Sequence, residues 1–187
     1  VGSFSKRRER VEMGLRRVSY IYTGLTGHPK GTPMELDRYD RLILEQLQKN
    51  GRITNQELAD AISLSPSPCL RRVRQLEEAG LIDGYVALLN ARKLGLTLMA
   101  FIQISMDKHT PERFDLFEKT VGSYPEVLEC HLITGQSADY LLKVIVKDMD
   151  GYQQFLLQNL TRIEGVSGVH SSFVLKSPIN GTALPLL

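Results

Sequence analysis

The sequence has little of what marks secreted scaffolds or membrane proteins. It contains two cysteines in 187 residues, too few for a disulfide framework, so a reducing compartment is the simpler expectation. No apolar run reaches the roughly 18 residues that a membrane-spanning helix requires. The basic residues near the start are not followed by an apolar stretch, so they do not predict a secretory signal. We therefore expect a cytoplasmic protein without a membrane partner.

Net charge is also small, at +2, yet it is unevenly distributed. Residues 1–33 carry seven Lys or Arg against two Glu, whereas residues 34–187 hold 16 basic and 19 acidic side chains. Local clusters are therefore a better guide to nucleic-acid binding than the whole-chain charge. Residues 1–33 show no sustained period, and we expect a disordered basic extension that can add phosphate contacts. A helix over residues 7–17 and a non-native extension remain alternatives.

The segment after this extension begins with two capped helices. Asp37 is a predicted N-cap, and the helix that follows it ends at Asn50-Gly51. Thr54 opens the second helix, and Glu57 three residues later completes a capping box. Two short amphipathic helices in this spacing are typical of the first half of a helix-turn-helix domain.

A third helix and an extended segment complete this region. A tight turn over residues 63–65 leads into the helix, which begins at Pro66 or Pro68, where a missing N–H costs nothing. Gly80 is the predicted C-terminal cap. Residues 82–89 are predicted to form a strand or wing.

The third helix separates apolar and basic side chains onto opposite faces. At roughly 100° per residue, the set expected to pack inward is Pro66, Cys69, Leu70, Val73 and Leu76. Three arginines lie on the other side, and a guanidinium can fork onto guanine or clamp a phosphate. The candidate DNA-binding residues are Ser65, Ser67, Pro68, Arg71, Arg72, Arg74 and Gln75. We predict that Arg71 reads a base edge and that Arg72 or Arg74 contacts phosphate. Pairing of the arginines with Glu77 and Glu78 is the alternative.

After a connector over residues 90–97, the apolar period changes to that of strands. The predicted order is strand, helix, strand, strand, helix, strand, over residues 98–106, 111–121, 127–134, 140–146, 149–163 and 166–176. This is the split βαβ order of a ferredoxin-like domain. The predicted fold class is therefore α+β, a winged helix-turn-helix domain over residues 34–89 followed by a ferredoxin-like domain over residues 98–187. Both alternating sets of strand residues are rich in apolar groups, so we expect the helix-free sheet face to mediate self-association.

The helical segment resembles the helix-turn-helix of the Lrp/AsnC family, the feast/famine regulators. The matching residues are Leu36-Asp37-Arg38-Tyr39-Asp40, Gly51-Arg52-Ile53-Thr54-Asn55 and Leu64-Ser65-Pro66-Ser67-Pro68-Cys69-Leu70-Arg71-Arg72-Val73. The resemblance covers residues 35–185 and implies a transcription regulator of amino-acid metabolism or transport, not an enzyme. It also implies dimers that assemble into tetramers or octamers and a small amino-acid effector, with leucine or methionine favoured. A two-fold dimer would bind double-stranded DNA at a pseudo-palindromic operator, with half-sites about one helical turn apart.

The loop between the two middle strands is the predicted effector site. Similar regulators place the effector near a Gly-x-x-Asp-Tyr turn at a subunit interface, and this chain has one residue more between Gly135 and Asp139. Backbone N–H groups beside Gly135 could hold a carboxylate, and Asp139 could pair with an ammonium group. The candidate effector-binding residues are Thr134, Gly135, Gln136, Asp139 and Tyr140. A plain structural turn is the alternative.

Metal-binding and catalytic patterns are weak. Cys130 and His131 are adjacent on a predicted strand, so they point to opposite faces and cannot chelate together. His28 and His109 have no partners near them in the sequence. We therefore predict no metal, no cofactor and no enzymatic activity. The competing hypothesis is a small-molecule-binding ferredoxin-like oligomer without specific DNA binding, and three arginines opposite a helix core argue against it.

Overall fold

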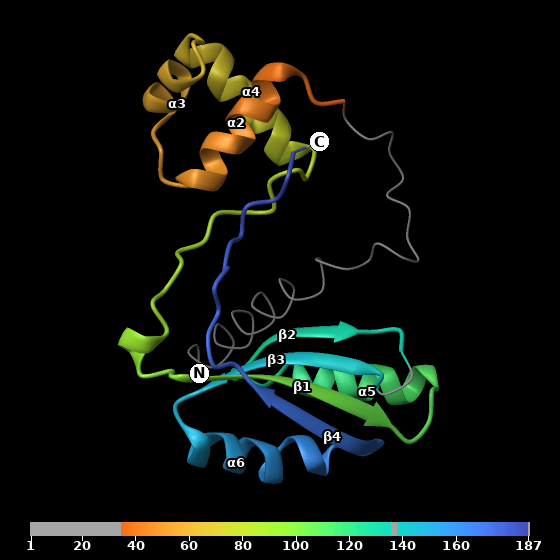
Figure 1. Cartoon of the computed structure of the whole chain (residues 1–187). Coiled ribbons are helices and arrows are strands. Elements are labelled where there is room, and N and C mark those ends of the chain that lie inside the picture. Colours follow the sequence, from red (N-terminus) through yellow and green to blue (C-terminus); the bar gives the residue numbers. More distant parts are fainter. Residues whose placement is uncertain (1–34, 136–137, 187) are drawn as a thin grey trace, which may run out of the picture. The chain divides into compact units, whose positions relative to one another are not determined.

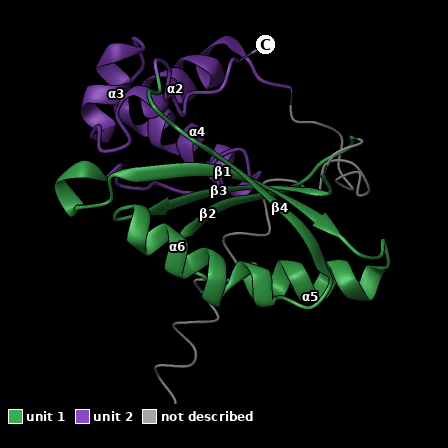
Figure 2. Ribbon diagram, turned by 60° about the horizontal axis from the view of Figure 1, so that its bottom comes forward, with its two compact units in different colours: residues 1–28, 90–177 green, residues 29–89, 178–187 purple. Residues whose placement is uncertain are grey.

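The computed structural model describes residues 35–135 and 138–186 of the chain (Figure 1). The expected basic extension lies outside these described residues. Contacts divide the chain into two compact units (Figure 2). The sheet unit contains residues 90–177, and the helical unit contains the described residues up to Leu89 together with those from Pro178 onward. The sequence-based boundary assigned every residue after 97 to one domain, and the structure differs by giving the last residues to the helical unit.

The helical unit contains the three predicted helices, α2 (Arg38–Lys49), α3 (Asn55–Ala61) and α4 (Pro66–Glu78). The Asp37 side chain caps α2 in a capping box with Asp40, and Thr54 caps α3 in the predicted box with Glu57. Gly80 follows α4 with φ of 70°, a left-handed conformation that a glycine adopts without strain. The predicted caps are therefore confirmed, Asp37 and Thr54 at the starts of α2 and α3 and Gly80 after the end of α4.

One inward face from each of these helices forms a small buried core. Its fully or nearly buried members are Ile43, Leu44, Leu58, Ala59, Ile62, Cys69 and Leu76. The predicted inward set on α4 is partly wrong, because Leu70 is 40% exposed and Pro66 is also exposed. The inward face of α4 is thus narrower than its apolar composition suggests.

The predicted strand over residues 82–89 is absent from the described structure. These residues run without regular secondary structure, and the connector that follows contains only the 3-10 turn η1 (Arg92–Leu94). A strand requires a hydrogen-bonded neighbour, and no strand of the described single chain pairs with this segment. The Tyr85 hydroxyl instead donates a hydrogen bond to Glu77 at 3.0 Å.

The sheet unit has the predicted ferredoxin-like order. Its elements are β1 (Leu98–Met106), α5 (Pro111–Val121), β2 (Val127–Leu132), β3 (Tyr140–Val146), α6 (Met149–Gln158), the 3-10 turn η2 (Leu160–Arg162) and β4 (Val166–Phe173). The antiparallel sheet has the strand order β2-β3-β1-β4, which places β2 and β4 at opposite edges. Helix α6 ends at Gln158, earlier than the predicted end at residue 163, because the chain then tightens into the 3-10 turn η2.

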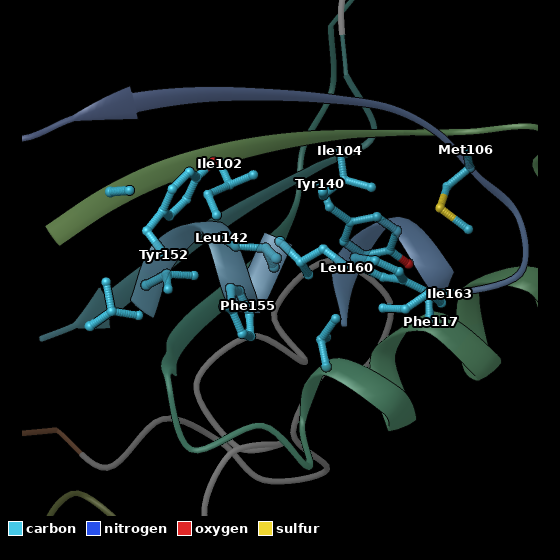
Figure 3. Close-up of a cluster of buried hydrophobic side chains, with 14 residues drawn as sticks. Ile102, Ile104, Met106, Phe117, Tyr140, Leu142, Tyr152, Phe155, Leu160 and Ile163 are labelled. Atoms are coloured by element: carbon cyan, nitrogen blue, oxygen red, sulfur yellow. The ribbon is translucent and has the colours of Figure 1, made fainter. Parts of the chain in front are cut away.

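Both helices of this unit cover one face of the sheet, where side chains from β1 and β3 meet them (Figure 3). Phe117 of α5 and Tyr140 of β3 are fully buried, with ring centroids 4.6 Å apart. Phe155 of α6 lies in the same cluster and meets Tyr124 in an edge-to-face contact. This core has more buried residues than that of the helical unit among the residues that the structure describes, and its aromatic rings bury large apolar areas.

The opposite sheet face is more polar than the sequence suggested. Phe101 and Leu141 lie on it, but the strand register places Lys143 beside Phe101 and Gln103 beside Leu141. Lys143 donates to Glu129 at 2.7 Å. The self-association predicted for this face would therefore need matched polar groups as well as apolar contact.

Candidate nucleic-acid interface and effector site

The start of α4 is fixed by contacts with α3. Ser63 adopts φ of 57° in the turn between the two helices, and the Leu64 N–H donates to the Ala59 carbonyl at 2.9 Å. The Asn55 side chain, at the start of α3, donates from Nδ2 to the Pro66 carbonyl at 2.9 Å. This bond joins the first turns of both helices, so it sets the angle at which α4 is presented.

The exposed side of α4 carries most of the predicted DNA-binding residues. Ser65, Ser67, Arg71, Arg74 and Gln75 are exposed, and Pro68 is half-buried. The first turn of α4 contains no acidic residue. Its N–H groups and helix dipole therefore favour a phosphate oxygen at this end.

Arg72 does not share this exposed surface. Its Nη1 lies 2.7 Å from Asp37 Oδ2 and 2.8 Å from Asp40 Oδ1, and its guanidinium lies 5.5 Å from the centre of the Tyr39 ring. The hydrogen bond to Asp40 raises the pKa of Arg72, and the backbone hydrogen bond from Asp40 lowers the pKa of Asp37. Arg72 is therefore committed to joining α4 to α2, and of the two arginines predicted as phosphate contacts, Arg74 is the one whose side chain is available.

The alternative pairing with Glu77 and Glu78 is absent from the described residues. Neither Arg71 nor Arg74 lies in a salt bridge there. Glu77 instead accepts the hydroxyl of Tyr85, and burial and this bond raise the pKa of Tyr85 to about 12. The two exposed arginines therefore keep their guanidinium groups for a solvent-side partner.

The predicted effector loop is tied to the neighbouring β1–α5 loop through Asp139. One carboxylate oxygen of Asp139 accepts the Met106 backbone N–H at 2.7 Å, and the other lies 2.7 Å from His109 Nε2. Thr134 and Gly135 are exposed, whereas Gln136 lies outside the described residues. Asp139 thus brings two loops together at one end of the sheet and still presents a partly accessible carboxylate, 21% exposed.

Tyr140 points away from this loop, into the core. It is 1% exposed, and its hydroxyl donates to Glu118 at 2.8 Å. Burial and this bond raise its pKa. Its side chain anchors the base of the loop from the helix-covered side, so any contribution to a ligand would come through the loop's position or through the backbone.

Local patterns in the sequence did not indicate that His109 pairs with Asp139, or that Arg72 pairs with Asp37 and Asp40. His109 contacts Asp139 from 30 positions away, and Arg72 reaches Asp40 across 32 positions. Contacts between residues so far apart leave no local pattern in the sequence. The one available signal was Asp40, an acidic residue on the buried side of α2, because a buried carboxylate needs a partner.

Metal ligation finds no support in the described part of the chain, where no three His, Cys, Asp or Glu residues gather. Cys130 packs against the sheet core, and its burial raises its pKa to about 12. His131 points to the other face, where it lies 3.2 Å from Glu129. Among the described helices, none is long and apolar enough to cross a membrane.

Comparison with known proteins matches both units. Residues 99–184 match the Lrp/AsnC ligand-binding domain, and residues 36–83 match a winged helix-turn-helix DNA-binding domain. The leucine-responsive regulatory proteins of Klebsiella pneumoniae and Escherichia coli K12 are each 45% identical over 142 residues, covering 76% of this chain and 86% of theirs. The chain belongs to the Lrp/AsnC family. As a member, it is a transcription regulator and not an enzyme, with one domain for DNA and one for a small ligand.

Solved structures of Lrp/AsnC proteins share this fold. A Neisseria meningitidis transcriptional regulator, solved as a complex with L-methionine, has a TM-score of 0.78 and 45% identity, covering 81% of this chain and 97% of that chain. An AsnC-family regulator from Agrobacterium tumefaciens has a TM-score of 0.76 and 35% identity, covering 80% and 97%. The winged helix-turn-helix and ferredoxin-like architecture is therefore confirmed.

Proposed function

We propose that this Lrp/AsnC protein binds a pseudo-palindromic operator through α4 of two subunits, with Arg71 on a base edge and Arg74 on phosphate. The observation that carries the proposal is the division among the three arginines of α4. Arg72 is held by two carboxylates within its own unit, whereas Arg71 and Arg74 are exposed beside a helix start without acidic residues. Specific readout needs a guanidinium that can reach a base edge, and a rigid helix to aim it.

Alanine variants of the arginines test this proposal on an operator chosen by selection from random DNA. Arg71→Ala should cost roughly 1–3 kcal/mol on the operator and little on random DNA. Arg74→Ala should weaken both and reduce the slope of log affinity against log salt by about 1. Arg41→Ala, an exposed change on α2, is the control. Equal losses on both DNAs for Arg71→Ala would show that this residue contacts phosphate.

The effector proposed for the ligand-binding domain is a small amino acid, with leucine and methionine the first to test. The curated relatives are named leucine-responsive, and the Neisseria relative was solved with L-methionine. In this chain, exposed Thr134 and Gly135 belong to the same loop as Asp139, whose partly accessible carboxylate supplies the negative charge that an ammonium group requires. Gln136 and Tyr140 complete the proposed site, Tyr140 through the backbone or the position of the loop.

Asp139→Asn is the sharpest test of this site. The amide oxygen can still accept the Met106 N–H, so the loop keeps its tie while the charge is lost. At a ligand concentration 100 times the dissociation constant of the wild type, the ligand should add about 2.7 kcal/mol to the free energy of unfolding. Asp139→Asn should lose this gain. Asp115→Asn, exposed on α5, is the matched control. If Asp139→Asn is stabilised by the ligand as much as the wild type, the ammonium group binds to another residue.

The proposed assembly is a homodimer that forms tetramers or octamers, with the effector shifting the balance between them. A ligand changes DNA binding only if it favours one arrangement over another. Sedimentation with and without leucine or methionine measures the shift. An unchanged distribution, with DNA affinity that still responds, would exclude assembly as the route.

A further inference from the structure

The last residues of the chain leave the sheet unit and join the helical unit. After β4 the chain has no regular secondary structure, and residues from Pro178 onward cluster with the helical unit (Figure 2). Leu175 and Ile179 are 95% and 91% exposed, so the passage between the units is not itself buried. The side-chain and hydrogen-bond contacts that hold the segment lie near its end, at Ala183, Leu184 and Leu186.

Two anchors hold the segment against α2. The Gln48 side chain donates from Nε2 to the Leu184 carbonyl at 3.1 Å, and the Leu184 N–H donates to Gln48 Oε1. One amide side chain thus satisfies both backbone groups of a residue 136 positions away, as a neighbouring strand would. Leu186 forms the second anchor, because its side chain packs against the buried core of the helical unit.

These anchors lie at the end of α2 opposite to the Arg72 contacts. Gln48 follows Asp40 by eight residues, which is about 12 Å along a helix. The segment and α2 enclose a groove lined by Glu45, Gln48, Lys49, Ala183, Leu184 and Leu186. None of these residues belongs to the exposed arginine surface of α4, so docking leaves that surface open to DNA.

We propose that residues 178–186 form a strap that docks on α2 through hydrogen bonds and apolar packing, and so gives the helical unit a second, non-covalent attachment to the chain of the sheet unit. The first connection is the extended segment through residues 82–97, which lacks strand or α-helix up to Thr97. A unit held at two points samples fewer orientations than one held at a single flexible linker. The segment that forms the second wall of the groove, opposite α2, is the chain's own C-terminal segment, and its release increases the freedom of the DNA-binding helices.

Hydrogen exchange on the full chain tests the docking. Truncation after Ser177, Gln48→Ala and Leu186→Ala should each speed exchange of the amides in the second half of α2 severalfold. Two controls are built into the groove. Leu184→Ala removes a side chain that is 73% exposed while keeping its backbone bonds, and Lys49→Ala removes a groove residue that forms neither anchor. Unchanged exchange in the truncated chain, or equal effects of Leu184→Ala and Leu186→Ala, would overturn the strap.

Rotational diffusion tests the consequence. In the truncated chain, nuclear spin relaxation should give the helical unit a shorter correlation time than in the wild type, with the sheet unit changed less. Identical correlation times would show that the segment does not restrict the unit.

Cross-linking identifies the occupant. Lys49→Cys and Ala183→Cys place two thiols in the lining of the groove without replacing an anchor. A short bis-maleimide should join these two thiols. A product at monomer mass supports the chain's own segment, whereas a product at dimer mass assigns the groove to the segment of a second copy and overturns this assignment. The native thiols of Cys69 and Cys130 have pKa values raised by burial and should not compete.

Discussion

The two units of this protein bury their interiors by different means. The core of the sheet unit includes four buried aromatic side chains, Phe117, Tyr140, Tyr152 and Phe155. The core of the helical unit has seven buried residues and no aromatic ring. Because apolar burial stabilises by about 25 cal/mol per Å², the smaller aliphatic core contributes less, and short chains bury a smaller share of their surface.

The helical unit compensates with directional polar contacts. It holds Asp40, the only buried charged residue in the described structure, and ties it to Arg72 of another helix. Two capping boxes fix the starts of α2 and α3. Such polar ties hold the three helices in a defined geometry at modest stability, which suits the DNA contacts proposed for Arg71 and Arg74. We therefore expect the helical unit to be the less stable of the two.

Removing a ring from the aromatic core should produce the greatest loss. Phe117→Ala leaves a cavity beneath Tyr140 and should cost roughly 3–5 kcal/mol, confined to the unfolding transition of the sheet unit. Leu116→Ala, at a neighbouring position that is 41% exposed, should cost well under half of that. Urea unfolding followed by hydrogen exchange in each unit separates the transitions. Equal destabilisation of both units would mean that they unfold together, and that the difference between their cores does not make one unit less stable than the other.

Removing the buried carboxylate should destabilise the helical unit by about 2 kcal/mol. Asp40→Ala leaves Arg72 with Asp37 as its remaining carboxylate partner, so the loss should lie below the cost of an unpaired buried charge. Asp60→Ala, an exposed change on α3, should stay within about 0.5 kcal/mol. A double-mutant cycle with Arg72→Ala measures the coupling. Coupling near zero would show that the polar tie does not support this unit.

Most of the fold follows from local signals in the sequence. Apolar periodicity predicted β1, α5 and β3 with the bounds that the structure has. Turn and capping residues such as Thr54 and Gly80 located the starts and ends of helices, because their conformations depend on neighbouring backbone. Where periodicity was weaker, as at the ends of β2 and β4, the predicted strands were too long.

The site depends more on contacts that cross the chain. The exposure of Arg71 and Arg74 was predictable from helical spacing, but the diversion of Arg72 to Asp40 was not. The loop around Asp139 was located by resemblance, yet its ties to Met106 and His109 arise only when two loops meet at one end of the sheet. The docking of Leu186 is likewise invisible in a segment without any period.

Two threonines at helix starts compare the units at a finer scale. Thr54 accepts the Glu57 N–H and caps α3, whereas Thr110 begins α5 without a side-chain capping bond. Thr54→Ala should therefore cost about 1 kcal/mol in the helical unit, and Thr110→Ala only a few tenths in the sheet unit. Chemical denaturation of each variant provides the values. Similar losses would show that capping matters equally in both units.

Each unit also contains one native cysteine, which reports its opening without any mutation. Burial raises the pKa of Cys69 in the helical unit, and raises that of Cys130 in the sheet unit to about 12. A buried thiol whose pKa is raised stays protonated near neutral pH, so labelling requires exposure first. If the helical unit is less stable, a disulfide reagent should modify Cys69 before Cys130, as read by mass spectrometry of peptides.

Cys130 lies on edge strand β2, so local fraying of this strand is a competing route to labelling. The urea dependence of labelling separates fraying from opening of the whole unit. Faster labelling of Cys130 with a steep urea dependence would place the lower stability in the sheet unit and reverse the expected order.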